Sequence, residues 1–113
     1  MNDAPNAPVL HTIRLRGAWT TVPDGDRVRH TRRFGWPTAL DLHERIWLVC
    51  PDLPGAAAVA LNGIAVGLTA AGALAADVSA RLLPRNELEI TTHAGAHPGD
   101  VRLEVRPADS AGG

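Results

Sequence analysis

The sequence predicts an all-β protein, an antiparallel β-sandwich built as a single domain. Three observations lead to this prediction: short segments in which apolar and polar side chains alternate, turn-forming residues between those segments, and a length of 113 residues. A chain of this length forms one hydrophobic core and has no room for a second. Short strands at regular intervals, separated by turns, are typical of two packed antiparallel sheets. The expected strands are residues 9–17, 27–36, 45–51, 57–61, 64–67, 87–92 and 101–106.

The first two expected strands are separated by a turn. In residues 9–17, Ile13 and Leu15 fall on one face because side chains alternate along a strand. Pro-Asp-Gly-Asp at residues 23–26 predicts the turn, since proline fixes one backbone angle and glycine accepts the next. The strand at residues 27–36 has two distinct faces. Val28, His30, Arg32 and Phe34 share one face, and Arg27, Arg29, Thr31 and Arg33 share the other.

Residues 45–51 are apolar on both faces, which indicates a central strand covered on both sides. Residues 37–44 before this strand are expected to form a loop, and a turn follows at residues 52–55. Three large aromatic side chains are expected to fill the space between the sheets. They are Phe34, Trp36 and Trp47.

A tight hairpin is expected at Asn62 and Gly63, between the strands at residues 57–61 and 64–67. A type I′ turn needs two positive φ angles, and asparagine followed by glycine adopts them at low cost. This is the strongest local signal in the chain.

The last part of the domain is expected to contain an irregular segment, a short turn and two strands. Residues 70–76 are small and lack a helical stripe, so we expect no regular structure there. Asp77 is placed to cap one helical turn that ends before Pro84. A Gly/Pro loop at residues 93–100 separates the final two strands. The residues of these strands that should face the core are Leu88, Ile90, Val101, Leu103 and Val105.

Composition excludes several classes of protein. A net charge of -1, from 11 basic and 12 acidic residues, is too balanced for a nucleic-acid coat or a membrane-surface protein. A hydrophobic content of 45% is too high for a disordered chain. A single cysteine, Cys50, cannot form an internal disulfide.

The two ends are expected to be loose, with the domain spanning residues 9–107. Residues 1–8 are polar and lack the basic and apolar regions of a signal peptide, and residues 108–113 lack apolar periodicity. The longest apolar run, residues 64–76, is interrupted by glycine and is too short to cross a bilayer. We therefore expect no membrane contact and a cytoplasmic protein.

Five segments resemble, in order, the N-terminal jelly-roll module of glycoside hydrolase family 2, the sugar-binding domain of β-galactosidases and β-glucuronidases. The most specific is the hairpin VALNGIAVG at residues 59–67. The others are RRFGWP at 32–37, RIWL at 45–48, DVS at 77–79 and LLPRNELEI at 82–90. The resemblance covers roughly two thirds of the chain and implies a jelly roll of the galactose-binding-domain type.

Each residue matched to the family has a structural role available, so the match identifies a fold and does not identify an active site. Fold and function are separable. Asn62 and Gly63 supply the turn, Asp77 can accept hydrogen bonds from free amides, and Asn86 can hold a bend through an Asx-type bond. A family 2 hydrolase carries an immunoglobulin-like domain and a catalytic barrel after this module. This sequence contains neither, so the resemblance implies a shortened, stand-alone relative that is not an enzyme.

No catalytic or metal site is expected. Glycoside hydrolysis needs two carboxylates facing each other across a cleft, whereas Glu87 and Glu89 lie two apart on one strand, as on a solvated face. Cys50 lies within a strand, where a small buried hydrophobic role is usual. The histidines lack zinc-ligand spacing and read as surface loop residues: His11, His30, His43, His93 and His97. No cofactor is predicted. Structural calcium is common in jelly-roll binding modules, and the sequence does not show it.

The sequence indicates a non-catalytic binding module, with protein contact or self-association into a homo-oligomer favoured over carbohydrate. The residues proposed for a sugar are Trp19, Trp36, Arg33 and His43. One alternative is an accessory subunit of a glycoside hydrolase encoded on another chain. Another is a single-stranded nucleic-acid binder that uses the strand from Arg27 to Phe34. Net charge disfavours nucleic acid.

Overall fold

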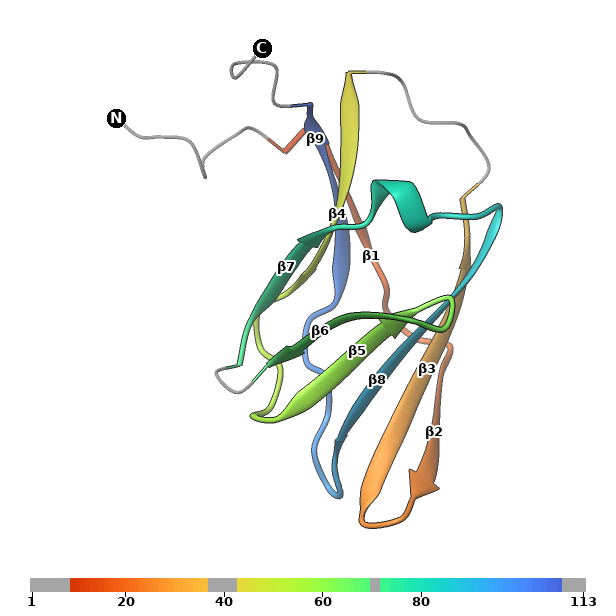
Figure 1. Ribbon diagram of the computed structural model, residues 1–113, viewed down its shortest axis with the longest axis vertical. Helices are drawn as coiled ribbons and strands as arrows, with labels where there is room; N and C mark the ends of the chain where they lie inside the picture. The colour runs from red at the N-terminus through yellow and green to blue at the C-terminus, as the bar shows by residue number, and fades with distance from the viewer. Residues whose placement is uncertain (1–8, 37–42, 70–71, 109–113) are drawn as a thin grey trace.

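The computed structural model describes residues 9–36, 43–69 and 72–108 and shows two antiparallel sheets packed face to face (Figure 1). The predicted antiparallel β-sandwich is therefore confirmed. The strands are β1 (His11–Arg14), β2 (Trp19–Asp24), β3 (Arg27–Gly35), β4 (Glu44–Cys50), β5 (Ala57–Leu61), β6 (Ile64–Thr69), β7 (Leu74–Asp77), β8 (Arg85–His93) and β9 (Arg102–Pro107). A short 3₁₀ helix, η2 (Ser79–Arg81), lies between β7 and β8. No helix in the described ranges is long and apolar enough to cross a membrane.

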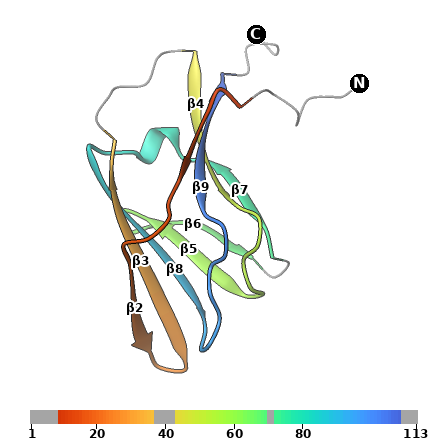
Figure 2. The same ribbon diagram turned by 180° about the vertical axis from the view of Figure 1, so that it is seen from behind.

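The four-stranded sheet has the order β1-β9-β4-β7, and the five-stranded sheet has the order β2-β3-β8-β5-β6. Figure 2 shows the four-stranded sheet from behind, with β1 and β9 side by side. The chain passes from one sheet to the other at every connection between consecutive strands except β2–β3 and β5–β6. Each sheet therefore has one face toward the core and one outer face.

The core is formed by side chains that alternate toward the space between the sheets. Five large aliphatic side chains at its centre are no more than 1% exposed: Ile46, Leu48, Leu61, Leu88 and Leu103. Burying an aliphatic side chain of this size stabilises the fold by about 1.5–3 kcal/mol. The alternation read from the sequence thus assigns the inner faces of β8 and β9 correctly.

Two strands were not predicted, β2 and β7. The residues expected as a turn begin too early, because Pro23 lies within β2 and the turn itself is at Gly25 and Asp26. β2 is an edge strand, and proline is tolerated there because one side of an edge strand needs no backbone donor. β7 replaces part of the expected irregular segment at residues 70–76 and pairs with β4. Small alanine side chains hid its strand pattern.

The prediction that Trp47 fills the space between the sheets is wrong. It alternates with the buried Ile46 and Leu48, so it points from β4 to the outer face of the four-stranded sheet, where it is half-buried. Trp36 and Phe34 do pack against the core. The expected loop at residues 37–44 and the loose ends at 1–8 and 108–113 lie mostly outside the described residues.

Candidate interaction face

The asparagine of the hairpin turn also joins three elements. Asn62 has a φ of 54° and Gly63 a φ of 81°, as a type I′ turn requires. The Asn62 amide donates hydrogen bonds to the carbonyl of Arg81 and to Oδ1 of Asn86, both at 3.0 Å, and its Oδ1 accepts from the backbone N–H of Glu87 at 2.9 Å. The hairpin tip is thereby fixed to η2 and to the start of β8.

Asn86 and Asp77 hold the two bends on either side of η2. Asn86 is 3% exposed; its Oδ1 accepts from the backbone N–H of Leu83 and its Nδ2 donates to the Leu83 carbonyl, both at 2.8 Å. Asp77 accepts hydrogen bonds from the backbone N–H of Ser79 at 2.9 Å and from Nε of Arg45 at 2.8 Å. All three family-motif side chains thus make hydrogen bonds that hold the fold together.

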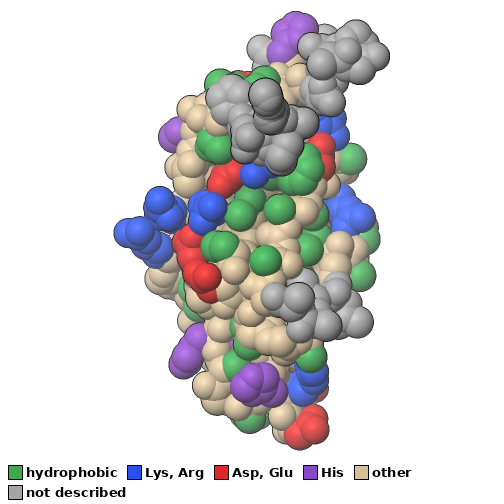
Figure 3. Space-filling view, turned by 90° about the vertical axis from the view of Figure 1, so that its left-hand side faces the viewer, with side chains coloured by type: hydrophobic (Ala, Val, Ile, Leu, Met, Phe, Trp, Pro, Cys, Tyr) green, Lys and Arg blue, Asp and Glu red, His purple; other side chains and the backbone are tan. Residues whose placement is uncertain are grey.

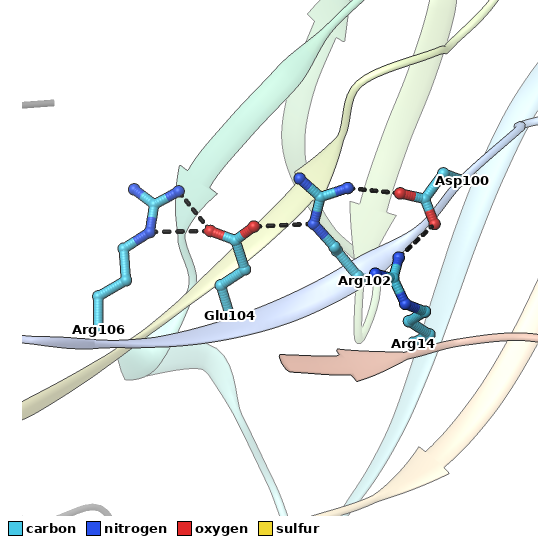
Figure 4. A network of polar contacts seen from close by, with 5 residues as sticks. All are labelled: Arg14, Asp100, Arg102, Glu104 and Arg106. Atoms are coloured by element: carbon cyan, nitrogen blue, oxygen red, sulfur yellow. Dashed lines mark hydrogen bonds and ion pairs between the residues drawn. The ribbon is translucent and has the colours of Figure 1, made fainter. Parts of the chain in front are cut away.

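The outer face of the four-stranded sheet carries a continuous row of paired charges on and beside β9 (Figure 4). Glu104 accepts hydrogen bonds from Nε of Arg102 at 2.8 Å and from Nη2 of Arg106 at 2.6 Å. Asp100 pairs with Arg102 and, at 3.7 Å, with Arg14. The row follows β9 and ends at Arg14 on the neighbouring strand β1, and each of these five charged side chains has at least one partner of opposite charge.

Glu104 lies at the centre of this row, and its side chain is only 7% exposed. Burial alone would raise the pKa of this carboxyl, but hydrogen bonds from Arg102 and Arg106 outweigh burial and hold the pKa below its ordinary value. The same contact with Glu104 raises the pKa of Arg102. The face is therefore stabilised by charges that already satisfy one another.

Trp47 belongs to this face and is also occupied. The guanidinium carbon of Arg106 lies 4.7 Å from the centre of the Trp47 ring, a cation–π contact. One side of the indole ring is thus covered by an arginine that also binds Glu104.

The outer face of the five-stranded sheet carries the arginine-rich strand β3. Arg33 pairs with Glu87 at 3.2 Å, Arg29 pairs with Asp24 at 3.7 Å, and both terminal nitrogens of Arg27 donate to the carbonyl of Ala56 at 3.1 Å. These outward arginines have internal partners, which weakens their use as a phosphate-binding surface.

Beside these arginines, the same outer face has a hollow of about 410 Å³ between β5, β6 and β8. Its surroundings are small and mostly apolar: Ala58, Val59, Ala60, Ala65, Val66, Gly67, Glu89 and Thr91. β6 forms the edge of this sheet. The side of the molecule that carries β6 and β7 shows a band of hydrophobic side chains with charged side chains on both flanks (Figure 3). Small side chains leave the sheet backbone open to close approach.

Two charged side chains on this face differ from those on the other sheet. Glu89, half-buried at the hollow, and Arg85, exposed on the same strand, have no ion pair or side-chain hydrogen bond within the described parts of the chain. The sequence indicates a solvated face for Glu87 and Glu89, and only the structure separates a paired Glu87 from an unpaired Glu89.

The residues proposed for sugar binding lie on different parts of the molecule. Trp19 packs against the core, and its indole N–H donates to the carbonyl of Leu15 at 2.9 Å; Trp36 also packs against the core. Arg33 points outward from β3 and pairs with Glu87. His43 is exposed just before β4, in the other sheet. The hollow includes none of the four.

The histidines and the cysteine form no reactive cluster. His30 is buried, contrary to the expected surface position, and its ring nitrogens lie 3.1 Å and 3.0 Å from the hydroxyls of Thr21 and Thr92. Burial and the nearby His97 lower the pKa of His30. Burial raises the pKa of Cys50 to about 12, which leaves the thiol unreactive. Within the residues described, no three His, Cys, Asp or Glu side chains converge on a metal position.

Solved structures of glycosidases contain the same arrangement of strands. A β-glucuronidase from Bifidobacterium dentium matches 74% of this chain with a TM-score of 0.62 and 19% identity, over 22% of its own length. A putative β-galactosidase from Bacteroides fragilis matches 71% with a TM-score of 0.58 and 19% identity, over 15% of its length. A β-glucuronidase from glycoside hydrolase family 2 matches 74% with a TM-score of 0.58 and 16% identity, over 12% of its length.

The chain shares the fold of one segment of these glycosidases. This agrees with the resemblance read from the sequence, and at these identities it concerns the fold alone. The chain spans less than a quarter of the length of each of these proteins. No protein-family model matches the sequence, and no curated protein matches it.

Proposed function

We propose that the protein is a non-catalytic binding module that contacts another protein through the outer face of its five-stranded sheet. The observation that carries this proposal is the apolar hollow over β5, β6 and β8, which is bordered by a carboxylate without a partner in the described residues. Exposed apolar surface with a polar border is typical of protein-contact sites.

The chemistry of the hollow favours a protein side chain over a sugar ring. Sugar rings stack on exposed aromatic faces, whereas alanine, valine and glycine provide most of this surface. The three tryptophans have other contacts: Trp19 and Trp36 with the core, and Trp47 with Arg106. The unpaired Glu89 favours a partner that brings a cationic group, because an apolar surrounding strengthens the attraction.

Placing a bulky charge in the hollow tests this proposal. The immobilised chain is used to capture a protein partner from extracts of cells that produce the chain. Ala60→Arg should abolish this capture, because the long arginine side chain would fill the hollow. The matched control is Ala75→Arg, the same change on the outer face of the four-stranded sheet, which should leave capture intact. Equal capture by both variants would exclude this face, and circular dichroism checks that both variants fold.

Carbohydrate binding is a second candidate, favoured by the fold shared with segments of β-glucuronidases and β-galactosidases. It would use Trp19, Trp36, Arg33 and His43, or place the chain as an accessory subunit of a glycosidase. Titration with glucuronate or galactose should then change the tryptophan fluorescence. We expect no change, since the described contacts of the tryptophans are internal.

A further inference from the structure

Strand β8 presents three charges in a row on the outer face: Arg85, Glu87 and Glu89. Successive outward residues of a strand are about 6.6 Å apart, so the two end charges lie about 13 Å from each other. The central charge is compensated, because Arg33 pairs with Glu87 at 3.2 Å. The end charges are opposite in sign and unpaired within the described residues.

This pattern is complementary to itself. A twofold axis that lies parallel to the sheet, perpendicular to β8 and above Glu87, brings Arg85 of one copy opposite Glu89 of the other, and the reverse. Because Arg33 lies opposite Glu87 in the register of β3 and β8, each Arg33–Glu87 pair faces its own copy across this axis, and the pairing within each copy leaves that central contact close to neutral. An axis along β8 would instead bring Arg85 opposite Arg85 and Glu89 opposite Glu89, and such contacts between like charges cost energy.

The small side chains beside β8 permit such an approach. Sheets packed face to face lie about 10 Å apart, a distance that arginine and glutamate side chains can bridge together. The alanines that line the hollow on β5 and β6 are small, so these side chains do not hold two copies apart there: Ala58, Ala60 and Ala65.

We propose that the partner at this face is a second copy of the chain, joined by two reciprocal Arg85–Glu89 ion pairs around a twofold axis over Glu87. This inference rests on the proposed function, because it assigns an occupant to the same face.

Charge reversal tests the pairing by sedimentation over a range of protein concentrations. The wild type should dimerise reversibly, and Arg85→Glu or Glu89→Arg alone should weaken dimerisation about tenfold or more, since each opposes like charges. A mixture of the two single variants should associate again as a heterodimer, and so should the double variant. The control Arg16→Glu reverses another exposed arginine outside β8, one with no ion pair to any described residue, and should have no effect.

Restoration in the mixture separates lost contact from lost folding, because a misfolded variant is not rescued by its counterpart. A wild type that stays monomeric, or single variants that fail to recombine, would overturn the second copy as partner. If the wild type is monomeric while Ala60→Arg still removes partner capture, the proposed function stands and this inference falls. If Ala60→Arg changes neither measurement, both fall.

Discussion

The outer faces of the two sheets differ in how their charged side chains are paired. On the four-stranded sheet, Glu104 is 7% exposed and binds two arginines, in a row that continues through Asp100 to Arg14. On the five-stranded sheet, Glu89 lies beside an apolar hollow and has no partner in the described residues. One face is closed by its own charges, and the other leaves charge and apolar surface available.

This difference indicates which face can gain free energy by binding a partner. A partner on the four-stranded face would have to replace existing ion pairs, so the exchange returns little free energy. A partner on the five-stranded face would cover apolar surface and supply a charge to Glu89, so both contacts are new. Glu104 and Glu89 should therefore contribute differently to the stability of the folded chain.

The largest expected effect comes from neutralising each carboxylate. Glu104→Gln should lower the free energy of unfolding by about 2–4 kcal/mol, because two partly buried guanidinium groups lose their shared counter-charge. Measured at protein concentrations at which the chain is monomeric, Glu89→Gln should change it by less than about 0.5 kcal/mol, because no pair within the described residues of the chain is lost. Urea denaturation of both variants measures the difference. Similar losses in the two variants would contradict the contrast between the faces.

Acid should destabilise the four-stranded face first. The pKa values of Glu104 and Asp77 are lowered by their arginine and serine partners in spite of burial. Their stabilisation is therefore fully present above the unfolded pKa values, near 4, and is lost as pH falls through the lowered values. Urea midpoints should decline from about pH 5 downward, less steeply in Glu104→Gln than in the wild type. An unchanged slope in Glu104→Gln would argue against the prediction.

The control for this acid series is Glu89→Gln, which should keep the steep decline of the wild type. Burial lowers the pKa of His30, so this residue adds to the pH dependence of stability as well. Its contribution is the same in the wild type and in both variants and cancels when they are compared. A Glu89→Gln variant with a flattened slope would show that the five-stranded face also holds a paired carboxylate.

The smallest expected effect concerns two side-chain contacts, one on the outer face of each sheet. A double-mutant cycle on Trp47 and Arg106 should give a coupling of about 0.5–1 kcal/mol, as expected for a cation–π contact. The corresponding cycle on Arg33 and Glu87 should give less than about 0.5 kcal/mol, because the Arg33 side chain is 83% exposed and well solvated. Thermal unfolding of the single and double variants measures both, and the reverse order would contradict the comparison.

The sequence predicts the inner faces well because the period of two is a local property. Alternation alone assigns Leu88, Ile90 and Leu103 to the core, and two backbone angles at Asn62 and Gly63 decide the hairpin. It misses β2 and β7, which are edge strands with weak patterns whose existence depends on partners elsewhere in the chain. It places Trp47 inside because an aromatic in an apolar run gives no sign of its face.

The chain by itself thus determined a two-sheet sandwich, its core and its tightest turn, since each depends on neighbouring residues. Only the tertiary structure decided that Glu87 is paired and Glu89 is not, because the register of β3 and β8 places Arg33 opposite Glu87 and Thr31 opposite Glu89. The hollow has the same origin. It needs β5, β6 and β8 side by side, and no short segment of the chain contains that arrangement.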